Sequence, residues 1–504
     1  MSRERGIEDV TPVKIAIVGA GLAGLGMASA LREAGIDDFV ILEREDDLGG
    51  TWRDNTYPGC ACDIPSVLYC YAGEPNPDWS HVWAGQAEIR DYIRGVARRH
   101  DVDSRVRCGE EVLSAAWVQD RQRWAIETTA GRYHAELVIA ATGALVDPAI
   151  PALAGLEAFG GRVFHSARWD HDHDLRGRRV AVIGTGASAI QFVPEIQPLV
   201  RHLDLFQRTP PWVLPRANPA IPPRWRRRFA RHPRALELAR GLVFSVQELL
   251  HHGFRHPVLM KLAERRALAN LERQVADPRL RSRLTPHYRL GCKRVLGSDT
   301  WYPALCADNV EVTTSGIARV TEDGIVDRDG RHHPVDTIIL ATGFQVTDPV
   351  ISHRVRGRGG ELLADAWQGS PKAHLGIAVA GFPNLFLLLG PNTGLGHNSV
   401  LLMIEAQIRY LLALLGHRAR LGPAALEPTV AAQAGYVEQL DAAARETVWA
   451  TGGCSSWYMD RTGRNSALWP GSVRAYQRRL ARFDPADYLT ELPRALAEPA
   501  AALA

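Results

Sequence analysis

The sequence predicts an α/β fold with two Rossmann-like dinucleotide-binding domains and a helical insert. The main observation is a pattern that occurs twice: an apolar strand, a glycine turn and a helix with small residues. The pattern begins at Val13 (VKIAIVGAGLAGLGMASALREAG) and again at Arg178 (RRVAVIGTGASAIQFVPEI). Each copy is typical of a buried parallel strand that leads into a nucleotide-binding helix. The 504 residues suffice for two or three domains with complete cores.

Composition argues against several other classes of protein. The hydrophobic share of 46% and the charged share of 23% are ordinary for a globular protein, and the net charge of +3 gives no reason to expect nucleic acid as a partner. The seven cysteines are scattered without a Cys-x-x-Cys pair, which predicts reduced thiols and no metal site. We expect no transmembrane segment, because GIAVAGFPNLFLLLG is interrupted by Gly and Pro. The absence of a signal-peptide pattern favours a cytoplasmic location.

The first glycine turn has the features of a dinucleotide site. Gly19, Gly21 and Gly24 form Gly-x-Gly-x-x-Gly, which allows a tight turn, the approach of a pyrophosphate and close helix–strand packing. The phosphates are expected at the helix N-terminus, where the helix dipole favours negative charge. Glu43 ends the next strand, where its carboxylate can accept ribose hydroxyls. This acid favours a nucleotide without a 2′-phosphate, such as FAD or NAD.

The second glycine turn differs from the first at the position of the acid. Gly184, Gly186 and Ala189 form Gly-x-Gly-x-x-Ala, and the next strand ends in Gln-Arg-Thr instead of an acidic residue. The guanidinium of Arg208 can bind a 2′-phosphate with two hydrogen bonds, so this domain is predicted to bind NADPH. The alternative is an ordinary surface arginine at a strand end. One FAD site and one NADPH site on the same chain imply hydride transfer from NADPH to flavin.

Two further strands set the expected domain boundaries. The segments ELVIAATG (136–143) and DTIILATGF (336–344) both end in small-residue turns, where the chain is expected to leave and re-enter the first domain. Residues 1–150 and 335–504 are therefore predicted to form the FAD-binding domain with a C-terminal segment, and residues 151–334 the NADP-binding domain. An Arg-rich helical insert, about 216–285, is favoured as a solvated element. A membrane-surface helix and a basic rim for an anionic cofactor are the alternatives.

Two loops carry candidate polar groups. The segment GGTWRDNTYPGCACDIPS (49–66) is expected beside the flavin, and its Cys60 and Cys62 have the wrong spacing for the redox pair of a flavin disulfide reductase. Asp63 is either a functional acid or a turn residue. The segment HYRLGCKRVLGSDTWYPAL (287–305) supplies Lys293 and Arg294, which are either surface cations or a fixed positive charge near the flavin.

The chain resembles the type I Baeyer–Villiger monooxygenases, within the class B flavin-containing monooxygenases. The segment FGGRVFHSARWD matches the family fingerprint at Phe159, Gly161, His165, Trp169 and Asp170. The loop at 49–66 matches a second fingerprint at Gly50, Trp52, Tyr57, Pro58, Gly59 and Asp63. GCKRVL matches the segment with the active-site arginine, which falls on Arg294, and SSWYMDRTGRN resembles a C-terminal flavin-side segment that includes Trp457.

The resemblance implies an NADPH- and O2-dependent flavoprotein that inserts one oxygen atom next to a ketone carbonyl, giving an ester or lactone through a C4a-peroxyflavin. It implies that Arg294 stabilises the developing charge and that Asp63 positions Arg294. His165 and the fingerprint aromatics are expected to connect the two domains rather than to react. Further cofactor contacts are expected from Arg44, Thr51, Tyr69, Val112, Val400, Thr185, Ala187, Ser188 and Thr209.

Two alternative functions remain open at this point. The same flavin chemistry can oxidise sulfur or nitrogen, and a non-oxygenating NADPH–flavin reductase would release peroxide instead of an oxygenated product. The sequence predicts neither the identity of the ketone nor the oligomeric state.

Overall fold

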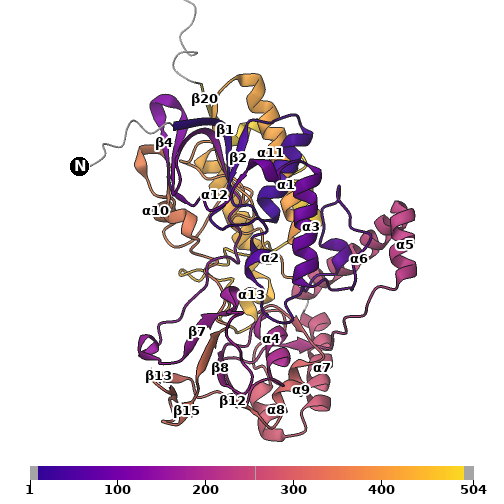
Figure 1. Ribbon diagram of the computed structural model, residues 1–504. Coiled ribbons are helices and arrows are strands. Elements are labelled where there is room, and N and C mark those ends of the chain that lie inside the picture. Colours follow the sequence, from indigo (N-terminus) through magenta and orange to yellow (C-terminus); the bar gives the residue numbers. More distant parts are fainter. Residues whose placement is uncertain (1–9, 256, 493–504) are drawn as a thin grey trace, which may run out of the picture.

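The computed structural model describes residues 10–255 and 257–492, and two sheets organise them (Figure 1). The first sheet has the strand order β17-β4-β5-β6-β1-β2-β3, and β18 also pairs with β6. Its central strands β6, β1 and β2 run parallel, as the first strand–turn–helix pattern predicts. The strands of this sheet are β1 (Val10–Val18), β2 (Phe39–Leu42), β3 (Val106–Arg107), β4 (Val112–Val118), β5 (Arg123–Thr128), β6 (Arg132–Ala140), β17 (Val355–Arg356) and β18 (Leu385–Leu387).

Both faces of the first sheet are covered, which explains why β1 is apolar without alternation. Ile15 and Ile17 belong to one core with α1 and α11, whereas Ala16 belongs to the core on the opposite face with Trp117 and Trp124. The helices of this half are α1 (Leu22–Glu33), α2 (Thr51–Asp54), α3 (Gln86–Arg99), α10 (Leu363–Trp367), α11 (Val400–Leu421), α12 (Val430–Arg445), α13 (Val448–Thr451) and α14 (Val473–Arg479). The short strands β19 (Ala425–Pro428) and β20 (Tyr488–Glu491) pair with each other.

The second sheet is parallel throughout and has the order β12-β9-β8-β16-β7. Its β8 and α4 come from the second strand–turn–helix pattern. The elements of this half are β7 (Arg162–His165), β8 (Arg179–Ile183), β9 (His202–Phe206), β12 (Val310–Thr313), β16 (Thr337–Leu340), the paired β10 (Val213–Leu214) and β11 (Leu296–Gly297), the three-stranded β13 (Ile317–Thr321), β14 (Gly324–Asp327) and β15 (His332–Pro334), and helices α4 (Ala189–Ile196) and α9 (Trp301–Leu305). The fold class predicted from the sequence is thereby confirmed.

The predicted insert is helical. It consists of α5 (Pro223–Arg231), α6 (Pro233–Arg255), α7 (Pro257–Gln274) and α8 (Pro278–Leu284). In Figure 1, α5 and the adjoining part of α6 stand off the two sheets at the right-hand edge of the molecule.

The chain passes between the two sheets at two adjacent places. Pro148 and Phe344 form an antiparallel bridge, and backbone hydrogen bonds join the Ala149 N–H to the Gly343 carbonyl and the Gln345 N–H to the Asp147 carbonyl. The two crossings therefore form one short two-stranded ribbon between the halves of the molecule.

The expected boundary at residue 335 differs from the structure. The boundary places β16 in the first domain, but β16 pairs with β7 and β8 in the second sheet. The physical reason is that the two strands have similar surroundings. β6 lies beside β1 in one sheet, β16 lies beside β8 in the other, and an Ala-Thr-Gly turn follows each strand. The chain returns to the first sheet only after Leu340.

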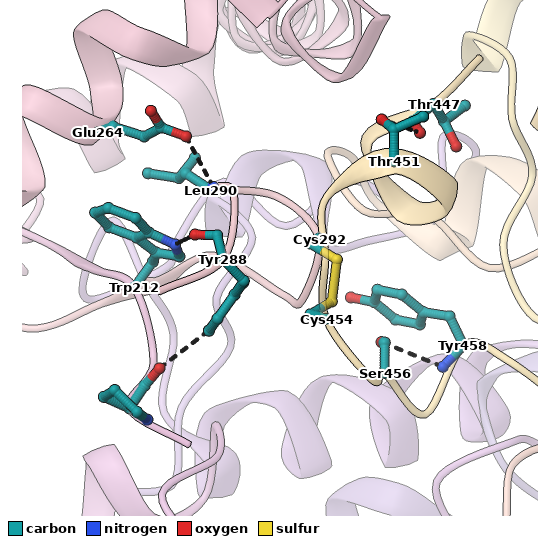
Figure 2. Close-up of a disulfide and its surroundings, with 11 residues drawn as sticks. Trp212, Glu264, Tyr288, Leu290, Cys292, Thr447, Thr451, Cys454, Ser456 and Tyr458 are labelled. Atoms are coloured by element: carbon teal, nitrogen blue, oxygen red, sulfur yellow. Dashed lines mark hydrogen bonds between the residues drawn. A yellow bond between two sulfur atoms is a disulfide. The ribbon is translucent and has the colours of Figure 1, made fainter. Parts of the chain in front are cut away.

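The expectation that all cysteines are reduced is wrong, because Cys292 and Cys454 form a disulfide (Figure 2). These residues are 162 positions apart, so no sequence spacing indicates that they meet. The fold brings them together because the Arg289 N–H donates to the Gly452 carbonyl at 2.9 Å. Cys60, Cys62, Cys70, Cys108 and Cys306 are free.

Within the described residues, one helix is long and apolar enough to span a membrane by length and composition alone. This helix is α11, and 56% of its most apolar window is buried inside the molecule. Glu405 and Arg409 interrupt its apolar sequence, so the helix contains no continuous apolar run of membrane-spanning length. Its packing against α1 and α14 is that of a core helix.

Candidate functional site

A cavity of about 980 Å³ lies between the two sheets. Val18 and Leu42 bring the carboxyl ends of β1 and β2 to its wall, and Ile183 and Phe206 bring those of β8 and β9. Ligands of open α/β sheets bind at these strand ends, so one cavity serves both glycine turns.

The first glycine turn is packed closely against neighbouring backbone. Gly19 has a φ of +104°, and a Cβ there would lie 2.7 Å from the Ala141 carbonyl oxygen. A Cβ on Gly24 would lie 1.9 Å from the Gly19 carbonyl oxygen, so Gly24 permits helix packing and does not line the cavity. Gly21 and Gly50 meet at the cavity wall, where a Cβ on Gly50 would lie 3.1 Å from the Gly21 Cα. Backbone thus lines the wall where a pyrophosphate would lie.

The acid after β2 is held in a fixed position. Glu43 lines the cavity and accepts hydrogen bonds from the Ala20 N–H at 2.8 Å and from Arg53 Nη1 at 3.1 Å. Its neighbour Arg44 also lines the cavity and forms an ion pair with Asp147 at 2.8 Å. The acid therefore lies at the cavity wall, although Arg53 compensates part of its charge.

The second glycine turn repeats the first in a more open form. Gly184 has a φ of +113°, and its Cβ would lie 2.3 Å from the Ala341 carbonyl oxygen, which matches the contact between Gly19 and Ala141. Apart from Gly186 itself and its two chain neighbours, no heavy atom of the described residues lies within 4 Å of a Cβ on Gly186. Ala189 is fully buried at the start of α4 and does not line the cavity.

Two cations flank the second turn. Arg208 and Lys293 both line the cavity, and burial together with the charge of Arg208 lowers the pKa of Lys293. Thr185 Oγ1 donates to the Thr209 carbonyl at 3.1 Å, which ties the turn to the segment carrying Arg208. Two close positive charges favour an anionic ligand at this position.

Asp63 and Arg294 form a bidentate ion pair in the cavity wall. Arg294 Nε and Nη2 donate to the two carboxylate oxygens at 2.5 and 2.7 Å, and Nη1 donates to the Leu395 carbonyl at 3.4 Å. Burial alone would raise the pKa of Asp63, but the charge and hydrogen bonds of Arg294 and the charge of Arg216 lower it. Burial alone would lower the pKa of Arg294, and Asp63 raises it instead. Both groups are therefore charged.

The residues of the first fingerprint, within the segment 159–170, lie outside the cavity lining. His165 ends β7, where its Nδ1 accepts from the Ala167 N–H at 3.1 Å and its ring contacts Phe344 of the crossing ribbon. Burial lowers the pKa of His165 to about 4, so the ring is neutral. Trp169 packs on Phe164 and Phe192.

The surroundings of the fingerprint complete the connection between the two halves. A Cβ on Gly161 would lie 2.2 Å from the Asp336 carbonyl oxygen and 2.7 Å from the ring of Phe159. Asp170 binds Arg162 at 2.5 Å. Arg168 reaches across to the first half, with ion pairs to Glu45 at 2.7 Å and to Asp54 at 3.1 Å.

Most other predicted contacts also reach the cavity. Trp52 Nε1 donates to Tyr69 Oη at 3.0 Å, and Trp457 lines the cavity while remaining 45% exposed. The remaining predicted residues in the lining are Thr51, Val112, Val400, Ala187, Ser188 and Thr209. Sequence reasoning missed Arg216, whose charge acts on Asp63, because it has no local pattern.

Comparisons with known proteins decide the family. The family model described as pyridine nucleotide-disulphide oxidoreductase matches residues 16–248. A Baeyer–Villiger monooxygenase of Streptomyces coelicolor is 48% identical over 94% of this chain and 92% of its own length. The chain belongs to the Baeyer–Villiger monooxygenase family. A second Baeyer–Villiger monooxygenase, from Pseudomonas aeruginosa, is 48% identical over 95% of this chain and 92% of its own length.

Solved structures of cyclohexanone monooxygenases are similar to this Baeyer–Villiger monooxygenase over nearly the whole chain. One from Rhodococcus sp. Phi1, bound to NADP+, has a TM-score of 0.85 and 27% identity, covering 94% of this chain and 97% of its own. Another, bound to ε-caprolactone, has a TM-score of 0.83 and 28% identity, covering 96% of this chain and all of its own. This Baeyer–Villiger monooxygenase is an FAD-dependent, NADPH-dependent enzyme.

Proposed function

We propose that Asp63 and Arg294 form the catalytic pair of a reaction that inserts one oxygen atom next to the carbonyl of a small ketone. The observation that carries the proposal is the bidentate ion pair in the wall of a cavity bounded by both glycine turns. Bound FAD, after reduction by NADPH, supplies the oxygen derived from O2.

Arg294 supplies a positive charge that does not depend on pH, because a guanidinium keeps its proton. Asp63 fixes the plane of this guanidinium through two hydrogen bonds. A preorganised cation stabilises the negative charge that develops on the ketone oxygen, and it does so without reorganising during the reaction. The lowered pKa of Asp63 keeps the pair ionised at neutral pH.

We assign FAD to the first glycine turn and NADPH to the second. Glu43 supports the first assignment, since its carboxylate suits ribose hydroxyls and opposes a 2′-phosphate. Arg208 and Lys293 support the second, because two adjacent cations bind a 2′-phosphate. Trp457, at the cavity wall, is assigned to the nicotinamide end of NADPH.

The segment 159–170, which contains the first fingerprint, is assigned to the connection between the two cofactor domains. Arg168, Trp169 and His165 contact the first half, the α4 helix and the crossing ribbon respectively. Such contacts suit a hinge that holds two domains in defined arrangements.

A small cyclic ketone is the proposed substrate. The lining beyond Arg294 includes the apolar side chains of Leu395 and Leu468 and the indole of Trp457. The similarity to the cyclohexanone monooxygenase bound to ε-caprolactone supports cyclohexanone as the first substrate to test.

The cytoplasmic location stays a prediction, and the disulfide argues against a reducing compartment.

The test compares Arg294→Ala and Arg294→Lys with the unchanged enzyme, using cyclohexanone and a sulfide as substrates. We expect Arg294→Ala to keep its FAD and its NADPH oxidation but to lose lactone formation by at least about 100-fold, the usual effect of removing a charge-stabilising donor. Arg418→Ala is the matched control, because it breaks another ion pair, to Glu136 at 3.0 Å, outside the cavity lining. Lactone formation at an unchanged rate in Arg294→Ala would overturn the assignment.

A further inference from the structure

The helical insert presents an apolar stripe to solvent. Leu238, Leu242 and Leu249 of α6 are 76%, 68% and 67% exposed, and they recur at intervals of four and seven residues, so they share one face of the helix. Val246 and Leu250 are also more than half exposed beside them. Single exposed leucines are ordinary, but a continuous stripe on one helix face indicates an interaction surface.

The opposite face of α6 already has partners. Glu248 accepts hydrogen bonds from the Val473 and Arg474 backbone N–H groups, and it pairs with His397 at 3.2 Å. Leu236 and Phe254 are buried on this side. The exposed stripe is therefore not needed to hold α6 on the enzyme.

A dense group of arginines adjoins the stripe. Residues 223–236, which cover α5 and the start of α6, contain six arginines and no acidic residue. Arg226 pairs with Asp78, and Arg228 lies over the ring of Trp225. The other four are exposed and make no ion pair within the described part of the chain: Arg224, Arg227, Arg231 and Arg234.

We infer that α5 and α6 form a docking surface for an anionic lipid membrane. A helix with exposed leucines beside arginines and an exposed tryptophan suits the boundary between headgroups and acyl chains, where the leucines enter the apolar layer and the arginines meet lipid phosphates. The position of α5 at the edge of the molecule leaves this surface accessible (Figure 1). Residues 223–240 contain seven arginines and one acid, the exposed Glu237, so the charge favours an anionic lipid surface over a second copy of the chain.

The surface also adjoins the candidate site. Asn398 lines the cavity, and its Nδ2 donates to Glu248 of α6 at 3.2 Å. A docked α6 would thus hold one side of the cavity wall close to the membrane, although the docking itself does not depend on the proposed catalytic roles.

The first experiment is sedimentation of the FAD-loaded enzyme with vesicles. One set contains phosphatidylglycerol and phosphatidylcholine in equal amounts, and the other contains phosphatidylcholine alone. We expect binding to the anionic vesicles, weakened by 0.5 M NaCl on the order of tenfold or more through charge screening, and little binding to the neutral vesicles. Equal binding to both sets, or no binding to the anionic set, would overturn the inference.

Variants separate the contributions of charge and apolar area. Replacement of Arg224, Arg227, Arg231 and Arg234 by Gln should weaken binding to anionic vesicles by roughly fivefold for each arginine. Leu242→Gln with Leu249→Gln should weaken binding at both salt concentrations. The matched controls are Arg319→Gln and Val430→Gln, which change an exposed arginine and an exposed apolar residue elsewhere.

All these variants should keep their FAD content and their NADPH oxidation, because the changed residues lie outside the cavity lining. Unchanged vesicle binding in both insert variants would refute the inference. A leucine variant that instead changes only the molecular mass in gel filtration would identify the stripe as a contact between copies of the chain.

Discussion

The Cys292–Cys454 disulfide makes a prediction about stability that can be worked out in numbers. It links positions 162 residues apart, and the loop-entropy relation for a loop of that length gives about 5 kcal/mol of stabilisation as an upper value. Cys292 is fully buried, and a Cβ on Gly452 would lie 2.6 Å from the Cys292 Cβ, so the two segments are already packed. Because these segments are packed together in the folded enzyme, we expect the bond to stabilise the protein mainly by lowering the conformational entropy of the unfolded chain.

The assay has two parts. Thiol titration of the enzyme unfolded without reductant should find five thiols, which are the free cysteines, and reduction should raise the number to the seven in the sequence. Urea unfolding with and without a dithiol should then differ by a few kcal/mol in the free energy of unfolding.

The control is the double variant Cys292→Ser with Cys454→Ser, which should be insensitive to the dithiol. Seven thiols before reduction would refute the bond itself. A wild-type enzyme whose unfolding is no more sensitive to the dithiol than that of the double variant would refute the stability argument. Loss of activity on reduction without loss of stability would indicate that the bond acts on Arg294, two residues after Cys292, rather than on the unfolded chain.

Three further predictions concern the cofactor site, the fingerprint and the insert. Arg208→Ala should lower the preference for NADPH over NADH by about 10- to 100-fold in kcat/KM, the usual effect of one charge-assisted interaction, and an unchanged ratio would exclude its role with the 2′-phosphate. His165 has a pKa of about 4 in place of 6.5, so the unfolded chain binds a proton that the folded enzyme does not, and stability should fall by up to roughly 3 kcal/mol as the pH drops between these values. His165→Gln should flatten that fall, and the same slope in denaturation curves of both proteins would contradict the assignment. Glu248→Ala should destabilise the enzyme by about 1–3 kcal/mol, because His397 and two backbone N–H groups lose their acceptor. The pKa of Glu248 is lowered from 4.5 to about 2, since these hydrogen bonds outweigh burial, so its contribution should be lost progressively as the pH falls from about 4.5 to about 2.

The local parts of the fold could be predicted from the sequence, and the non-local parts could not. Strand, glycine turn and helix are consecutive in the sequence at Gly19 and Gly184, so each unit can be recognised from one continuous segment. The Ala-Thr-Gly turns after β6 and β16 are equally local, but the sequence does not say which sheet each strand joins. That ambiguity produced the early boundary at residue 335.

The candidate site likewise contains residues that could be predicted from the sequence and residues that could not. Asp63 and Arg294 are 231 positions apart, and their pairing followed from family motifs rather than from spacing. Arg216 belongs to no motif, and only the fold brings it to the ion pair. The disulfide and the apolar stripe of α6 likewise depend on which surfaces meet and which stay uncovered.

The crossing ribbon also determines where the inserted unit could be removed from the chain. Because Pro148 and Phe344 are paired, the inserted unit begins and ends at neighbouring points, as expected of a domain placed within the loop of another. A short linker from Asp147 to Gln345, which already share a hydrogen bond, could rejoin the flanking chain after the unit is removed. The unit between them also carries Arg294 and Cys292, whose partners Asp63 and Cys454 lie outside it, so an exchange of the unit between relatives would have to preserve both pairings.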